Sequence, residues 1–155
     1  MASIGTAPAQ ASERMQQVNE RAAVAKMVST ARVSAGAKWF YWIAGLSLIN
    51  SLVVIFGGNI HFVVGLGIPS VVVDTWAKQA GIAGSVLDIG INGFVAGVFV
   101  LFGYFAVKGQ KWAFLVGMAL YALDGLLLFS MKDYLSVGFH AYALFAIYRG
   151  LQAVE

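Results

Sequence analysis

The stretch of sequence that decides the fold is residues 112–130, WAFLVGMALYALDGLLLFS. As a helix with a rise of about 1.5 Å per residue, it is long enough to cross a hydrocarbon layer roughly 30 Å thick. Asp124 lies well inside this stretch and is its single acidic side chain. A carboxylate inside a membrane helix costs at least about 2.5 kcal/mol unless another group binds it. The stretch therefore predicts a membrane helix in which Asp124 has a polar partner.

The composition of the whole chain indicates the same class of protein. Of its 155 residues, 60% are hydrophobic and 11% are charged, whereas soluble domains have about 25% charged residues. We therefore expect an all-α integral membrane protein with one membrane domain. The net charge of +3 is small and dispersed, so no nucleic-acid partner is predicted. The absence of cysteine excludes disulfides, thiolate ligands and thiol nucleophiles.

The apolar segments predict a bundle of four membrane helices within a domain that covers residues 39–151. The four spans are residues 39–57, 86–107, 112–130 and 134–151. Trp39, Tyr41 and Trp42 open the first span, in the position of an interfacial aromatic belt. Short charged turns separate the last three spans, which predicts antiparallel neighbours.

Two further segments flank the first span. Residues 60–80 have a short apolar core that Gly65, Gly67 and Pro69 interrupt, so we expect a re-entrant or interfacial segment on the outer side. Residues 1–38 form a cytoplasmic or membrane-surface segment. Residues 12–32 favour a helix with Ser12 as its N-cap, and their weak apolar stripe fits both a surface helix and a solvated tail.

The positive-inside rule orients this bundle with both termini in the cytoplasm. Eight of the ten basic residues then lie on the cytoplasmic side: Arg14, Arg21, Lys26, Arg32, Lys38, Lys108, Lys111 and Arg149. If residues 60–80 also crossed the membrane, Lys108 and Lys111 would move outside. We therefore expect four spans in the cell membrane.

Polar residues recur at one depth of the predicted spans. With a rise of about 1.5 Å per residue, Asn50, Asn92, Asp124 and His140 lie roughly 9 Å below the outer interface. Asp88 lies nearer the surface, and His61 opens the outer segment and can cover the layer. These six residues form a predicted polar layer and the candidate ligand or proton site.

Two interpretations of this layer remain open. Asp124 can accept hydrogen bonds that simply fasten helices, which contribute about 0.6 kcal/mol on average. Alternatively, Asp124 and His140 form a pair that carries a proton. Two pairs of small residues, Ser47 with Ser51 and Gly93 with Gly97, predict close helix packing.

Soluble-enzyme motifs are absent from the sequence. It contains no HExxH, Walker loop, GxSxG elbow or GxGxxG in a strand context. The acidic and histidine residues have no spacing typical of a metal site, so no metal and no cofactor are predicted. Catalytic residues stay unassigned, and a non-enzymatic role is favoured.

Three runs of sequence carry a resemblance: residues 41–51, YWIAGLSLINS; residues 112–125, which contain ALYALDG; and Gly138-Phe-His140. From residue 39 onward, the chain resembles a group of small bacterial multi-pass membrane proteins of unassigned function. The resemblance implies a bacterial cytoplasmic membrane and assigns no activity, ligand or site residue.

Three functions fit these features. The first is a small membrane binding or accessory protein that packs against itself or against a membrane partner. The second is a proton-coupled carrier that uses Asp124 and His140. In the third, a membrane enzyme or binder acts on a lipid or apolar small molecule, with Asp88, His61, Asp124 and His140 as acid/base groups. We rank them in this order.

Overall fold

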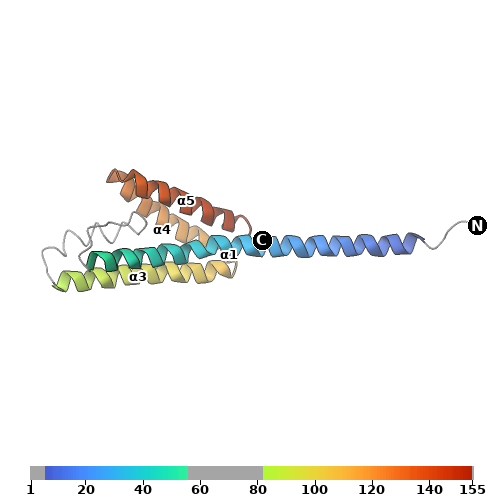
Figure 1. Cartoon of the computed structure of the whole chain (residues 1–155), viewed down its shortest axis with the longest axis horizontal. Coiled ribbons are helices and arrows are strands. Elements are labelled where there is room, and N and C mark those ends of the chain that lie inside the picture. The colour runs from blue at the N-terminus through green and yellow to red at the C-terminus, as the bar shows by residue number, and fades with distance from the viewer. Residues whose placement is uncertain (1–5, 56–81, 155) are drawn as a thin grey trace, which may run out of the picture.

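The computed structural model describes residues 6–55 and 82–154, and these residues form four helices and no strand (Figure 1). The all-α class is therefore confirmed for this part of the chain. The helices are α1 (Thr6–Ile55), α3 (Ile82–Val107), α4 (Lys111–Ser130) and α5 (Tyr134–Leu151).

Helix α1 has 50 residues and is about 75 Å long at 1.5 Å per residue. Its C-terminal half packs beside α3, and its N-terminal half projects beyond the other helices (Figure 1). The predicted N-cap at Ser12 is wrong, because the helix already begins at Thr6. Pro8 is compatible with this earlier start because the first turn of a helix tolerates proline. The predicted boundary at residue 38 lies inside this continuous helix.

The bounds of the other three helices follow the apolar segments, and short turns join them. In the turn after α3, Gly109 has φ +76° and its N–H donates to the Ala106 carbonyl, while the Gln110 N–H donates to the Phe105 carbonyl. This is a Schellman ending, which needs a left-handed residue at the Gly109 position. Lys132 occupies the same position after α4, with φ +63°. These tight turns place α3, α4 and α5 antiparallel in succession.

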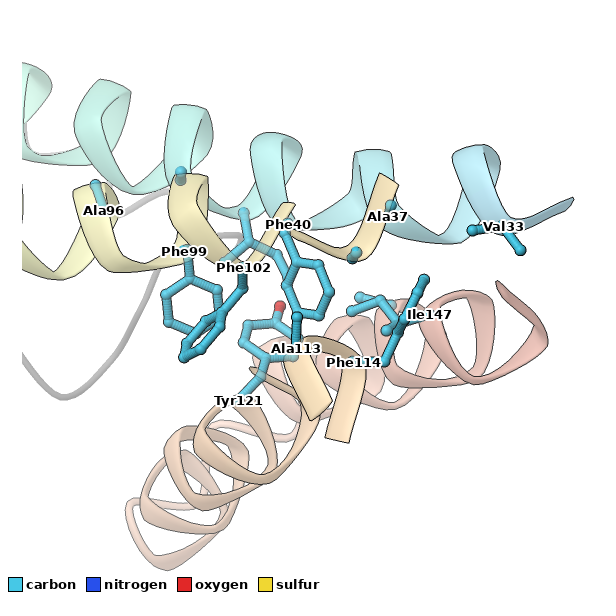
Figure 2. Close-up of a cluster of buried hydrophobic side chains, with 14 residues drawn as sticks. Val33, Ala37, Phe40, Ala96, Phe99, Phe102, Ala113, Phe114, Tyr121 and Ile147 are labelled. Atoms are coloured by element: carbon cyan, nitrogen blue, oxygen red, sulfur yellow. The ribbon is translucent and has the colours of Figure 1, made fainter. Parts of the chain in front are cut away.

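A cluster of aromatic rings joins α1, α3 and α4 (Figure 2). The Phe40 ring centroid lies 6.2 Å from those of Phe99 and Phe102, and 6.1 Å from that of Phe114. Tyr121 meets Phe99 edge to face, at 6.0 Å between ring centroids. Edge-to-face and tilted ring pairs are favourable beyond their buried area. The cluster thus fixes the inward face of α4 against α1 and α3.

Helices α1 and α5 cross at two glycines, Gly36 and Gly150. A Cβ atom added to Gly36 would lie 2.6 Å from the Gly150 Cα, and one added to Gly150 would lie 2.7 Å from the Gly36 Cα. Only glycine lets the two backbones approach this closely, as in other tightly packed helix pairs. The crossing brings the C-terminal end of α5 to the middle of α1.

Two of the described helices contain stretches long and apolar enough to cross a membrane, Gly90–Val107 and Lys111–Ser130. On α4 the usual polarity of a soluble helix is reversed. Asp124 is fully buried on the inner face, whereas Leu126 is 64% exposed on the outer face. Other large apolar side chains of α4 are also exposed, including Leu115, Leu123 and Phe129. Soluble proteins rarely expose continuous apolar surface of this extent.

The other predicted membrane segments stay predictions. The spans at residues 39–57 and 134–151 are not among the two stretches identified in the described residues. The proposed re-entrant or interfacial segment, residues 60–80, lies outside the described part of the chain. The count of four spans therefore stays a prediction as well.

Candidate functional site

Helices α4 and α5 each turn a polar residue toward the other. On α4, Tyr121, Asp124 and Gly125 are buried at helical spacing, and on α5 Ser136 and His140 are buried one turn apart. Residues three or four apart lie on the same face of a helix. The helical period therefore directs both sets of side chains into the α4–α5 contact.

Asp124 and His140 are in direct contact in this interface. The Asp124 Oδ2 and the His140 Nε2 lie 2.9 Å apart. The exposed fraction is 0% for Asp124 and 2% for His140, so water does not solvate either group. The structure thus brings together the two predicted residues that can exchange a proton, from positions 16 apart in the sequence.

The second ring nitrogen of His140 decides where the protons lie. The His140 Nδ1 is 2.8 Å from the backbone carbonyl oxygen of Ser136. A carbonyl oxygen only accepts, so the Nδ1 must carry a hydrogen. One further proton then bridges the Nε2 and the Asp124 Oδ2. It rests either on histidine, giving an ion pair, or on aspartate, giving two neutral groups. Both arrangements have zero net charge, which suits a buried site.

Tyr121 and Gly125 hold the imidazole of His140 in place. The Tyr121 ring stacks on it, with 4.1 Å between ring centroids and 15° between planes. On the same helix, a Cβ added to Gly125 would lie 3.3 Å from the His140 Cβ, so the absence of a side chain makes room for histidine. Sequence reasoning did not find either role. The signal that could have found them is the spacing of Tyr121, Asp124 and Gly125 on one helical face.

Two other residues of the predicted polar layer, Asn50 and Asn92, fall within the described part. Asn92 on α3 is buried and Asn50 on α1 is partly buried, and Ser47 on α1, a residue predicted for close helix packing, is buried as well. Each of them takes part in an interaction. In the described residues, every buried side-chain nitrogen and oxygen has a hydrogen-bond partner. All four described helices therefore bury a polar side chain.

Three predicted residues lie outside what the structure describes. His61 falls in the segment between α1 and α3, and the side chains of Ser51 and Asp88 are likewise not described. Their predicted roles, in the polar layer for His61 and Asp88 and in close packing for Ser51, stay predictions.

Gly93 and Gly97 lie on the outer face of α3. Both are exposed, and a Cβ added to either would have no described atom within 4 Å. Phe94 beside them is 74% exposed. Within the described chain these glycines contact no other helix, so their predicted role in close packing stays a prediction. Among the described residues, the close contact between two glycines is that of Gly36 with Gly150.

Asp133, the N-cap of α5, connects the site to the surface. Its side chain accepts hydrogen bonds from the Ser136 backbone N–H, at 3.2 Å, and from the Ser136 hydroxyl. These bonds fix Ser136, whose carbonyl accepts the proton of the His140 Nδ1. The hydrogen bonds from Ser136 lower the pKa of the Asp133 carboxyl below its ordinary value.

We expect Asp133→Ala to lower the free energy of unfolding by about 1 kcal/mol at neutral pH, as loss of an N-cap does. Because the folded-state pKa is lowered, this contribution is present above the ordinary pKa and disappears as the pH falls through the folded value. Unfolding followed at neutral and acidic pH in detergent tests this. Asp133→Asn keeps an accepting oxygen and should lose most of the pH dependence. A cost for Asp133→Ala that does not change with pH would contradict the assignment.

Among the described residues, no group of three histidine, aspartate or glutamate side chains is arranged to hold a metal. Comparisons with protein-family models, curated proteins and solved structures find no match for the chain. The arguments for function therefore depend on the geometry of the site and of the outer surface.

Proposed function

We propose that this chain is a small integral membrane protein of the binding or accessory class, with residues 39–151 as a four-span membrane domain. Two stretches of spanning length and the reversed polarity of α4 support this proposal. Lipid can cover the exposed leucines, while the α4–α5 contact removes Asp124 from lipid.

The distribution of charge supports an orientation with both ends of the domain in the cytoplasm. The Gly36–Gly150 crossing brings Arg32 and Lys38 of α1 to the same end as Arg149 of α5. The turn with Lys108 is at this end too, because Lys108 and Lys26 line one cavity. Exposed aromatic residues occur near this end: Trp42, Tyr104, Trp112 and Tyr148. Basic residues followed by an aromatic belt are typical of the cytoplasmic interface.

The binding role is supported by a surface of α3 that no other described helix covers. Gly93 and Gly97 are exposed, and the large apolar side chains of Phe94 and Leu101 stand beside them. Small residues between larger apolar ones let a second membrane helix approach closely. In this proposal the outer face of α3 binds a membrane helix of another copy or partner. The Asp124–His140 pair fastens α4 to α5 behind it.

A photoreactive benzoylphenylalanine in place of Phe94 tests the binding surface in the native membrane. We expect a cross-linked species whose yield falls roughly tenfold to a hundredfold when Gly97 is changed to leucine, since overpacking a contact costs about 1–3 kcal/mol. Within the chain, Gly97→Leu meets open space and should leave the fold intact.

The matched control carries the same photoreactive residue at Phe145, which is 59% exposed on α5. Gly138→Leu, at an exposed α5 glycine that also faces open space, serves as the control substitution. Equal cross-linking from both positions, or a yield at Phe94 that Gly97→Leu leaves unchanged, would contradict a binding site on α3.

A proton-coupled carrier is the second candidate, and the shared proton of Asp124 and His140 favours it. The hydrogen on the His140 Nδ1 leaves one bridging proton that can rest on either residue. Such a pair can load and release a proton if a change of helix packing exposes it. The accessory role ranks first because Asp124 and His140 are both buried, with Tyr121 stacked on the imidazole and Gly125 close to the His140 Cβ.

A further inference from the structure

A cavity of about 350 Å³ lies at the end of the bundle where the basic residues gather. Three separate parts of the chain line it. They are one turn of α1 with Lys26, Ser29 and Thr30, the turn after α3 with Lys108, and the residues after α5 with Val154. Neither Asp124 nor His140 lines this cavity, so it is separate from the buried pair.

Among the described residues, the charged side chains that line this cavity are all of one sign. They are two lysines, Lys26 and Lys108, and none of the described lining residues is an aspartate or glutamate. Within the described residues, neither lysine forms a salt bridge. Two ammonium groups beside one cavity repel each other, and a bound anion would attract both of them and offset that repulsion.

Lys108 is held in place by Tyr104. Its Nζ donates to the Tyr104 hydroxyl at 2.7 Å and lies 4.0 Å from the centre of the same ring. Hydrogen bonding and cation–π attraction together restrict this long side chain, which reduces the entropy that it loses on binding a ligand. An ammonium has three N–H donors, so two remain for a ligand.

Hydroxyl groups complete the polar side of the cavity. The Ser29 Oγ and the Thr30 Oγ1 donate to the Lys26 carbonyl, at 3.0 and 2.9 Å. A hydroxyl can rotate and donate to an anion instead. Val33, Val107 and Val154 form the apolar side. The site thus combines cationic and hydroxyl donors with an apolar wall, as a phosphate ester requires.

We propose that this cavity binds a phosphate group, with the ammonium groups of Lys26 and Lys108 as its charged ligands. If the membrane orientation proposed above holds, the cavity faces the cytoplasmic leaflet, whose anionic lipids attract basic residues. The phosphate then belongs to a phospholipid headgroup, and the valines contact its glycerol. A free phosphate in solution has the same chemistry and is separated from the lipid by experiment.

The lipid arm uses vesicles with equal amounts of phosphatidylglycerol and phosphatidylcholine. The full chain is reconstituted, extracted in mild detergent and examined by native mass spectrometry for retained lipid. We expect retained phosphatidylglycerol to fall about tenfold or more in the Lys26→Gln/Lys108→Gln double variant, since a direct hydrogen bond between charged groups contributes about a tenfold change in affinity or more.

The control is Lys38→Gln/Lys111→Gln, which removes two exposed lysines that do not line the cavity. It makes the same change in net charge, and we expect it to keep most of the retained lipid. An equal loss in both double variants would overturn the proposal, because general surface charge would then account for the binding.

The second arm measures the unfolding temperature in neutral detergent with inorganic phosphate against chloride at equal ionic strength. In one outcome, phosphate raises the unfolding temperature of the natural chain but not that of the Lys26→Gln/Lys108→Gln variant, while the vesicles show no preference for phosphatidylglycerol. This result would support the anion site and assign it to a soluble phosphate. No preference for phosphate or phosphatidylglycerol in either arm would overturn the site.

Alkaline extraction of native membranes tests the membrane placement separately. Release of the chain would contradict that placement, while the phosphate arm would still report on the cavity.

Discussion

Replacing Asp124 with leucine should lower the free energy of unfolding by about 2–3 kcal/mol. The substitution leaves the His140 Nε2 buried without its partner at 2.9 Å, while the Nδ1 stays bound to Ser136. Leaving a buried neutral group unsatisfied costs about 1–3 kcal/mol, against about 3–5 kcal/mol for a buried charge. The lower range applies because the bridging proton allows His140 to stay neutral. Unfolding in detergent micelles, followed by tryptophan fluorescence, measures the loss.

The double variant Asp124→Leu/His140→Leu should cost less than the sum of its two single changes, because it leaves neither polar group unpaired. Strict additivity would show that the two residues do not depend on each other. Asp124→Asn is the matched control: its amide can donate to the Nε2, so we expect a cost below about 1 kcal/mol.

The same asparagine variant separates the two functional candidates. It keeps a hydrogen bond to His140 but has no proton to share. A proton flux through liposomes that the natural chain supports and Asp124→Asn abolishes, with its stability intact, would favour the carrier. Retained cross-linking from Phe94 without any such flux would favour the accessory protein.

Changing Gly36 to alanine should destabilise the fold by about 2–3 kcal/mol. The new Cβ would lie 2.6 Å from the Gly150 Cα and 3.2 Å from the Ile147 carbonyl oxygen. These are backbone atoms, so no side-chain rotation relieves the overlap and the two helices must separate. Overpacking of this kind costs about 1–3 kcal/mol. We expect a similar loss for Gly150→Ala, measured by the same unfolding assay.

Gly45 on the same helix is the control for this prediction. A Cβ added there has no described atom within 4 Å, so Gly45→Ala should stabilise α1 by up to about 1 kcal/mol through helix propensity alone. The two alanine substitutions thus have opposite expected signs. If Gly36→Ala stabilised the protein as Gly45→Ala does, the close crossing of α1 and α5 would be wrong.

Much of this fold can be predicted from residues that are near each other in the sequence. The apolar runs place α4 and α5 within one residue of their observed bounds, and Lys132-Asp133 mark the turn between them. Local turn chemistry is sufficient here, because helix endings depend on a few adjacent residues. Ser12 shows the limit of such signals: it is a good N-cap residue, yet the helix starts earlier because its neighbours also favour helix.

The glycines show what local patterns cannot predict. Gly93 and Gly97 have the spacing of a packing motif, yet they face outward, whereas Gly36 and Gly150 form the close contact without any shared motif. Spacing states which residues of one helix share a face. It does not state whether that face turns toward the other helices, because this depends on the packing of all of them together.

The sequence by itself determined that Asp124 needs a partner, because a carboxylate in a long apolar segment is costly unless another group binds it. It also predicted that His140 lies level with Asp124 along the neighbouring helix, because this level follows from the helical rise and the turn between α4 and α5. Only the tertiary structure decided that these two side chains meet, that Tyr121 stacks on the imidazole, and that Ser136 fixes its Nδ1 proton. Those contacts depend on how α4 and α5 are rotated about their own axes. The aromatic cluster and the Gly36–Gly150 crossing fix these rotations, and both involve residues from distant parts of the chain.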